Sequence, residues 1–198
     1  MRKRHKGPLL AGDKIYLRPI VKKDINRRYL SWLNDNSVVK YMINKGSPTT
    51  YTSLQKYFQN MQKSKDNIMF AIVTKKENIH IGNVKLGKIN WTHRYGDLGI
   101  MIGEKRCWCM GYGQEACRLL LEYSFTKLNL NKVFLGVCQK HVAAIKLYKK
   151  VGFKVEGRIK DLYNFEGRYM DKIYMGISQQ EFLKQRKRIR IYGTGLQR

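Results

Sequence analysis

One stretch near the middle of the chain, Ile100–Leu121, constrains the fold more than any other. It follows an apolar run at residues 98–102 that is typical of a buried strand. A short basic loop then leads to Gly111-Tyr112-Gly113, after which apolar residues recur at helical spacing. The first N–H groups of a helix have no intrahelical partner, and glycines let an anion approach the backbone closely. We therefore expect a strand, a loop and a helix that together form a phosphate site.

The residues around these glycines exclude two common phosphate sites. A nucleoside-triphosphate loop needs Gly-Lys-Ser or Gly-Lys-Thr at the start of the helix, whereas Gln114 and Glu115 follow Gly113. A dinucleotide-binding turn needs a third glycine, where this chain has Ala116, and belongs near the start of a βαβ unit. Both of these phosphate sites are therefore disfavoured, and a tight structural turn is the alternative to an anion site of another kind.

Two segments resemble a known family. Residues 108–116, Trp-Cys-Met-Gly-Tyr-Gly-Gln-Glu-Ala, resemble the acyl-coenzyme A loop of the GNAT superfamily of N-acetyltransferases. They are most similar to the branch with the ribosomal-protein N-terminal acetyltransferases and the amino-sugar acetyltransferases of surface-polysaccharide and flagellin-glycan pathways. Residues 141–153 are similar to the family's next helix, and the likeness extends over residues 14–181. Cys109 and Met110 stand where Gly and Lys are usual, and His141 stands where Asn is usual.

The resemblance implies that acetyl-CoA is the co-substrate. The residues expected to bind it are Met101, Ile102, Gly103, Trp108, Cys109, Met110, Gly111, Tyr112, Gly113, Gln114, His141 and Tyr148. The Tyr148 hydroxyl would protonate the departing thiolate, since a phenol has a pKa near or above that of a thiol. The alternative is that Tyr148 is only a core aromatic. The backbone N–H of Ile102 or Gly103 would stabilise the oxyanion.

The general base is left open among several groups. The chain holds 14 acidic residues, and Asp97 and Glu104 flank the central strand, so these two are the leading candidates. Asp171 and His93 are alternatives, and direct loss of the proton to water is another. Glu115, in the first turn of the phosphate helix, is expected to support the loop or the helix dipole.

The acceptor amine is also open. The resemblance favours a nucleotide-linked amino sugar, whose diphosphate would suit Lys85, Lys88 and Arg94. The alternative enzyme activity is acetylation of a protein N-terminus, with the net charge of +26 aiding contact with ribosomal RNA. A third hypothesis is a nucleic-acid-binding protein on a degenerate acetyltransferase scaffold, although no basic face interleaved with aromatic residues is evident in the sequence.

Composition is typical of a globular protein. At 198 residues, 43% hydrophobic, the chain is long enough for one domain with a real core. Its four cysteines, at 107, 109, 117 and 138, suit neither a disulfide framework nor a zinc site. We expect no metal, no membrane span and no signal segment, and therefore a cytoplasmic protein. We expect a monomer or a homodimer.

The element order predicts an α/β protein. Expected strands cover residues 14–20, 68–75, 79–89, 97–103, 132–138, 153–160 and 168–177. Expected helices cover 24–33, the segment after Thr50 to about residue 64, the segment after Gly113 through Tyr123, 141–150 and 182–190. Helices between strands imply a mixed, mostly antiparallel sheet with one splayed parallel pair. The expected organisation is a basic mobile arm (1–12), one acetyltransferase domain (13–181) and a basic C-terminal helix and tail (182–198). A Ser178-x-x-Glu181 capping box is expected to begin the last helix.

Overall fold

The structure, a computed structural model, describes residues 10–42, 48–165 and 167–193. The chain divides into two compact units: Met1–Ile89 with Asp97–Leu120, and Asn90–Gly96 with Leu121–Arg198. The whole is an α/β protein whose strands pair mostly antiparallel, as expected. The prediction of a single domain over residues 13–181 stays a prediction.

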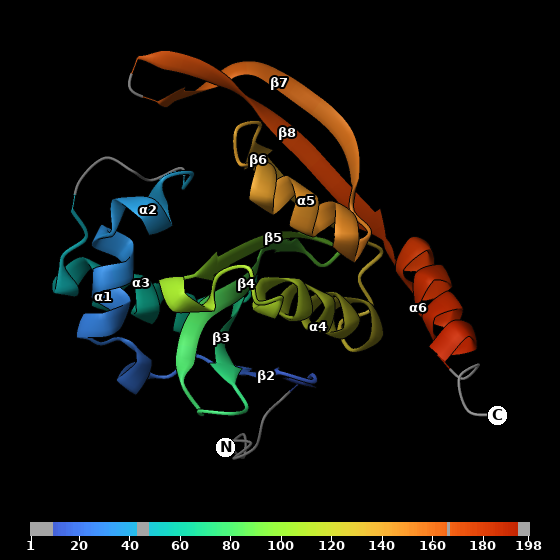
Figure 1. Ribbon diagram of the computed structural model, residues 1–198, viewed down its shortest axis with the longest axis horizontal. Coiled ribbons are helices and arrows are strands. Elements are labelled where there is room, and N and C mark those ends of the chain that lie inside the picture. The colour runs from blue at the N-terminus through green and yellow to red at the C-terminus, as the bar shows by residue number, and fades with distance from the viewer. Residues whose placement is uncertain (1–9, 43–47, 166, 194–198) are drawn as a thin grey trace. The chain divides into compact units, whose positions relative to one another are not determined.

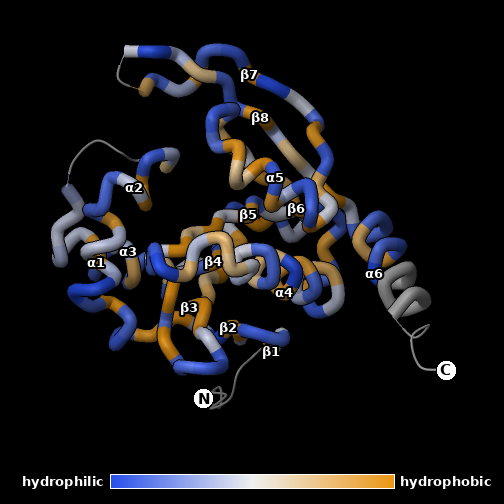
Figure 2. The backbone as a smooth tube through the Cα atoms, in the orientation of Figure 1, coloured by the Kyte–Doolittle hydropathy of each residue, from blue (hydrophilic) through white to orange (hydrophobic). Residues whose placement is uncertain are grey.

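Unit 1 is built on antiparallel strands. Its strands are β1 (Leu10–Ala11), β2 (Ile15–Pro19), β3 (Ile68–Thr74), β4 (His80–Asn90) and most of β5 (Tyr95–Ile102). Its helices are η1 (Lys22–Asp24), α1 (Arg27–Asn34), α2 (Asn36–Val39), α3 (Tyr51–Lys63), η2 (Lys105–Cys107) and the first part of α4 (Tyr112–Thr126). In Figure 2, β3 is hydrophobic along its length, which agrees with its almost complete burial. Such a strand has to be covered on both faces.

Two helices cover one face of the unit 1 strands. Tyr29 and Trp32 of α1 and Leu54 of α3 form a core cluster with Met101 of β5, and Met69 of β3 packs against it. Each of these helices has an N-cap: the Asn26 side chain accepts the Tyr29 N–H, and Thr50 and Ser53 form a capping box before α3. Burial of each large apolar side chain stabilises the fold by roughly 1.5–3 kcal/mol.

Unit 2 contains the remaining strands in the order β6–β8–β7, all antiparallel neighbours. They are β6 (Lys132–Cys138), β7 (Lys154–Phe165) and β8 (Arg168–Ser178), with helices α5 (Val142–Val151) and α6 (Gln179–Gly193) and the end of α4. Figure 1 shows β7 and β8 as a long hairpin, with α6 directly after β8. The Arg94 carbonyl, just before β5, accepts the N–H groups of Asn131 and Lys132. The starts of β5 and β6 therefore lie side by side, as in a parallel pair.

Most expected elements are confirmed, and the differences have identifiable causes. Leu10–Ala11 pair with β2, so this part of the expected mobile arm is a strand; residues 1–9 lie outside the described residues. The first helix begins at Arg27 rather than residue 24, because Asn26 caps it and the Asp24 side chain is buried in an ion pair. The capping box is confirmed, since Ser178 and Glu181 exchange hydrogen bonds at the start of α6. In the described parts of the chain, no helix is long and apolar enough to span a membrane.

Candidate active site

The end of β5 is held tightly in unit 1. The Gly103 N–H donates to the Ile81 carbonyl at 2.9 Å, and the Trp108 indole N–H donates to the Ile102 carbonyl at 2.8 Å. A Cβ at Gly103 would lie 2.0 Å from the Trp32 ring, so only glycine fits there. Strand end and loop are thus fixed to each other before α4 begins.

Two residues of the loop have left-handed backbone. Cys109 has φ of 61° and Gly111 has φ of 86°. Glycine adopts this conformation at no steric cost, whereas another residue there is strained. The position where the resembled family has Gly is therefore one where the backbone favours glycine, and the exposed Cys109 keeps the same turn.

Lys14 brings a positive charge to the same loop. Its ammonium donates to the Met110 carbonyl at 3.2 Å and lies 3.8 Å from the position of a Cβ on Gly111. The sequence indicated that Met110 removes the phosphate-facing lysine of the resembled family. The structure supplies a different lysine, from the start of β2.

Glu115 ties the N-terminal strand to α4. Its carboxylate accepts the Lys14 N–H at 3.0 Å and the Ile15 N–H at 3.4 Å. A Cβ at Gly12 would lie 1.9 Å from this carboxylate, so glycine permits the approach. The predicted support of the loop or the helix dipole by Glu115 stays a prediction; in the structure its oxygens hold the backbone segment that carries Lys14.

The two candidate oxyanion donors differ. The Gly103 N–H is already paired with Ile81, so it is not available as the oxyanion donor, and Ile102 is the candidate that remains. This corrects the expectation for Gly103, which the structure gives a positioning role against Trp32 instead.

The candidate bases have different surroundings. Glu104 lies 3.6 Å from the Arg106 guanidinium, with a side chain that is 24% exposed. Asp97 is half-buried on β5, on the same strand face as Gly99, where a Cβ would meet nothing within 4 Å. Asp97 and Gly99 therefore share one face of β5, and the space at Gly99 is open.

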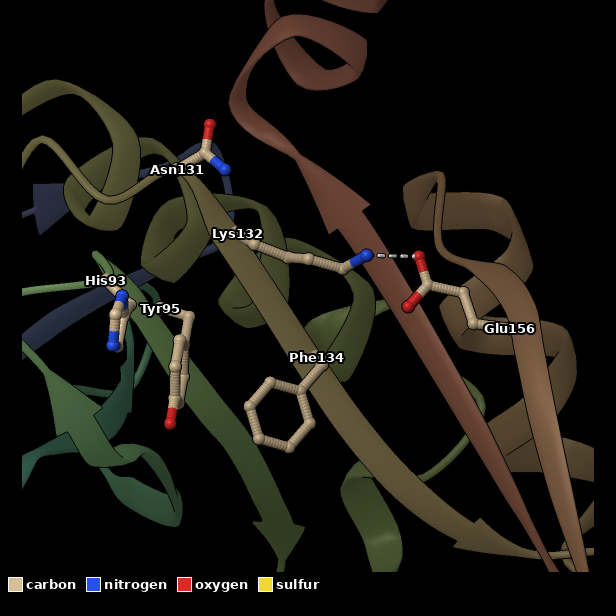
Figure 3. A pocket seen from close by; sticks show the side chains of 6 residues that line it. All are labelled: His93, Tyr95, Asn131, Lys132, Phe134 and Glu156. Carbon is tan, nitrogen blue, oxygen red and sulfur yellow. Dashed lines mark hydrogen bonds and ion pairs between the residues drawn. The ribbon is translucent and has the colours of Figure 1, made fainter.

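Two other candidates lie in unit 2. Asp171 is buried and ion-paired with Arg158. Its pKa is lowered, first by the hydrogen bond from the Asp161 N–H and then by Arg158, which makes it a weaker base. His93 lines a pocket of about 420 Å³ with Tyr95, Asn131, Lys132, Phe134 and Glu156 (Figure 3).

The second motif lies wholly in unit 2. Tyr148 of α5 is 8% exposed, and its ring lies 5.8 Å from that of Phe153 in an edge-on arrangement. His141 precedes α5 but makes no side-chain capping bond, and burial lowers its pKa. Tyr148 thus packs as a core aromatic within its own unit. Its acid role stays a prediction, as does the binding role of His141.

Comparison with known proteins decides the family. The model of the acetyltransferase (GNAT) domain matches residues 14–154. The chain belongs to the GNAT acetyltransferases. It is also 29% identical over 178 residues to the spermidine N(1)-acetyltransferase of Escherichia coli K12, covering 89% of this chain and 92% of that protein. The spermidine N(1)-acetyltransferase of Vibrio cholerae is 28% identical over 173 residues, covering 87% of this chain and 97% of that protein.

A solved structure agrees with this GNAT assignment. The crystal structure of the Vibrio cholerae spermidine N-acetyltransferase in complex with CoA and spermine matches with a TM-score of 0.79 and 26% identity. It covers 87% of this chain and 99% of that chain. This GNAT protein is therefore an acetyl-CoA-dependent N-acetyltransferase, which transfers an acetyl group to an amine.

The residues present fit acetyl-CoA as this GNAT protein's co-substrate. The positive-φ turn at Gly111 leaves room for a pyrophosphate, and the Lys14 ammonium lies beside it. Sequence patterns missed Lys14, because 96 residues separate it from Met110. They also missed the buried polar residues Asp24, His80 and Asn83, which lie on the covered face of unit 1.

Proposed function

We propose that the acceptor is the amine of a nucleotide-linked amino sugar. The amine would attack the acetyl carbonyl carbon, the C–S bond would break, and the products would be an N-acetylated sugar nucleotide and coenzyme A. Membership of the GNAT family supports acetyl transfer to an amine. The resemblance in the sequence favours a nucleotide-linked amino sugar as the source of that amine.

Charge pairing in unit 1 is the observation that supports this acceptor. Three carboxylates near the strand end already have basic partners: Asp24 with Arg18 at 2.6 Å, Asp35 with Lys105 at 2.6 Å, and Glu104 with Arg106. A polyamine is a polycation, and carboxylates that already have basic partners are less available to bind it. Together with the net charge of +26, this pairing disfavours spermidine and favours an anionic acceptor.

The pKa values in this region agree with stable ion pairs. The hydrogen bond from Lys105, followed by that from the Ser37 N–H, lowers the pKa of Asp35. Burial raises the pKa of Asp24, but hydrogen bonds from Arg18 and the Val21 N–H outweigh it and lower the pKa overall. Both carboxylates are therefore ionised and engaged at neutral pH.

Lysines on β4 are available for the diphosphate of the acceptor. Lys85 is half-buried on the strand, and Lys88 is exposed with φ of 49°. Lys85 pairs in register with Met69, which places it on the face that α1 and α3 cover. A lysine there can bind phosphate as a point charge.

We propose the following catalytic roles. The N-terminus of α4, Lys14 and the turn at Gly111 would hold the pyrophosphate. The Ile102 N–H would stabilise the oxyanion, and Asp97 would take the proton from the ammonium form of the amine. The Tyr148 hydroxyl would protonate the thiolate as it leaves.

The cytoplasmic location expected from the sequence stays a prediction.

Isothermal titration of acetyl-CoA into wild type and Gly111→Trp tests the cofactor site first. We expect saturable 1:1 binding that the variant loses, since a side chain there would be strained and would fill the turn. Gly157→Trp is the matched control, because a Cβ at Gly157 meets nothing within 4 Å.

Wild type is then assayed for coenzyme A release with UDP-glucosamine, a peptide N-terminus and spermidine. Preference for spermidine would overturn the proposed acceptor.

A second candidate function, nucleic-acid binding, is favoured by one feature of unit 2. Tyr95 and Phe134 lie 5.8 Å apart beside Lys132, and the Lys172 ammonium lies 4.5 Å from the centre of the Tyr174 ring. Aromatic rings next to lysines can stack unpaired bases. This interleaved basic face was not evident in the sequence.

Fluorescence anisotropy with a labelled single-stranded RNA tests the second candidate. Binding should fall steeply as NaCl rises, and Phe134→Ala should weaken it about tenfold. Binding of equal strength by wild type and Phe134→Ala would exclude this face as the RNA site.

A further inference from the structure

The ring of Trp32 packs directly against the residue that follows β5. A Cβ on Gly103 would lie 2.0, 2.3 and 2.4 Å from three carbon atoms of this ring, Cδ2, Cγ and Cε3. Gly103 does not have a positive φ, so its backbone conformation is open to any residue, and the ring is what excludes a side chain. The indole therefore limits how far the Cα of Gly103 can move toward α1.

Trp32 is itself held in one orientation by its neighbours. Its side chain belongs to the core cluster of unit 1 and the residue is only 4% exposed. The ring centroid lies 5.2 Å from that of His80 and 5.8 Å from that of Tyr29, at interplanar angles of 76° and 49°. On a further side, the guanidinium carbon of Arg28 lies 5.9 Å from the ring centre. A buried ring packed in this way is a fixed wall, because interiors are close-packed.

His80 connects this wall to a buried ion pair. Its Nδ1 lies 3.9 Å from the Asp24 carboxylate, and its Nε2 lies 3.0 Å from the Asn83 side-chain amide. Arg18 in turn binds both oxygens of Asp24 at 2.6 and 2.7 Å. Burial lowers the pKa of His80, so its imidazole is neutral at neutral pH. The wall is thus anchored to β2 and η1.

Hydrogen bonds fix the same strand end in other directions. The peptide group between Ile102 and Gly103 is bonded on both sides: its N–H donates to the Ile81 carbonyl at 2.9 Å, and its carbonyl accepts the Trp108 indole N–H at 2.8 Å. These two bonds set the plane of that peptide group. The contact with Trp32 acts on the neighbouring Cα, where a hydrogen bond of the main chain cannot act.

We propose that Trp32 is a positioning residue for acetyl transfer. By packing on Gly103, it holds the N–H of Ile102 where the oxyanion develops on the acetyl carbonyl. This inference rests on the proposed function, which assigns the oxyanion to that N–H. An oxyanion donor has to lie about 2.7–3.1 Å from the developing charge, and a misplacement of about 1 Å can lower the rate about 100-fold. Trp32 acts through Gly103 and needs no contact with either substrate.

A double-mutant cycle of Trp32→Leu and Gly103→Ala tests the inference. Trp32→Leu should lower kcat about 10- to 100-fold and change the Kd for acetyl-CoA less than about twofold, because only the transition state uses the oxyanion donor. Gly103→Ala should lower kcat at least as far, since its methyl group overlaps the indole. In the Trp32→Leu background the methyl group has room, so adding Gly103→Ala should lower kcat by less than about threefold.

Leu54→Ala is the matched control. Leu54 is 2% exposed and belongs to the same core cluster, so its truncation should destabilise unit 1 while kcat below the melting temperature stays within about twofold of wild type. Trp32→Phe replaces Trp32→Leu if the leucine variant does not fold. Wild-type kcat in the Trp32 variant, an equal fall of kcat in Leu54→Ala, or the same effect of Gly103→Ala in both backgrounds would overturn the inference.

The cycle is measured with whichever of UDP-glucosamine, the peptide N-terminus and spermidine wild type acetylates fastest. Preference for spermidine would overturn the proposed acceptor and still test Trp32. If wild type acetylates none of the three, the proposed acceptor also fails, and the cycle is measured on the hydrolysis of acetyl-CoA by water, which forms the same oxyanion.

Discussion

The Lys14 ammonium lies 3.2 Å from the Met110 carbonyl oxygen, in the loop that connects β5 to α4. The same lysine contributes its backbone N–H to Glu115. One residue at the start of β2 thus contacts both sides of the proposed pyrophosphate turn. Lys14 thus supplies, from a distant segment, the positive charge that the loop lacks because Met110 stands where the family usually has lysine.

Removal of this lysine should weaken acetyl-CoA binding. Lys14→Met should raise the Kd for acetyl-CoA about tenfold, the effect of one charge-assisted contact. Lys76→Ala, an exposed lysine in the turn between β3 and β4, is the control and should leave the Kd unchanged. The double variant Lys14→Met/Met110→Lys should recover most of the affinity in the same titration. If Lys14→Met binds acetyl-CoA with unchanged affinity, Lys14 only stabilises the loop and does not contact the cofactor.

Replacement of the strained loop cysteine should stabilise the protein. Cys109 has φ of 61°, so Cys109→Gly should raise the free energy of unfolding by about 1 kcal/mol. Cys109→Ala keeps the strain and should not increase stability. Urea unfolding followed by circular dichroism measures both, and a gain in the alanine variant would argue against backbone strain.

The cysteines should differ in reactivity. Cys109 is exposed, whereas burial raises the pKa of the Cys117 thiol to about 12. Iodoacetamide should therefore label Cys109 first in the native protein, and saturating acetyl-CoA should slow this labelling at least several-fold. Peptide mass mapping after timed quenching measures the rates, with urea-unfolded protein as the control in which Cys117 also reacts. Cofactor-independent labelling of Cys109 would contradict its place in the cofactor site.

The role of Tyr148 can be separated from its packing. Tyr148→Phe keeps the ring beside Phe153 but removes the hydroxyl. If the hydroxyl protonates the thiolate, kcat should fall about 100-fold or more, with the Kd for acetyl-CoA and the stability little changed. A variant with wild-type kcat would leave Tyr148 as a core residue only.

Acid should weaken the start of α6. Hydrogen bonds from Lys154 and the Ser178 N–H lower the pKa of Glu181 from 4.5 to about 2. A carboxylate with a lowered pKa stabilises the fold above pH 4.5, and this contribution is lost as the pH falls toward about 2. Glu181→Gln should therefore be less stable than wild type at neutral pH, with the difference vanishing near pH 2. Thermal melts at several pH values test this, with Glu156→Gln as the surface ion-pair control.

Local patterns predicted the elements well. Apolar segments at residues 68–75 and 132–138 predicted β3 and β6, and the Ser178-x-x-Glu181 pattern predicted the start of α6. These patterns depend on residues that are close in the sequence, so they can be recognised without knowledge of the fold. The start of α1 shifted, because burial of Asp24 against Arg18 is a tertiary effect.

The sequence by itself determined the GNAT strand–loop–helix at residues 100–121 and the glycines that let an anion approach the backbone, since both follow from short-range sterics and helix-end hydrogen bonding. Only the tertiary structure decided which groups serve the site. Lys14 meets Met110, Trp32 covers Gly103, and His80 lies between Asp24 and Asn83. Each of the first two pairs is separated by at least 70 residues, and the third depends on the register of β3 with β4 and the placement of η1. Close approach of distant segments follows from packing and strand register, and no local pattern encodes it.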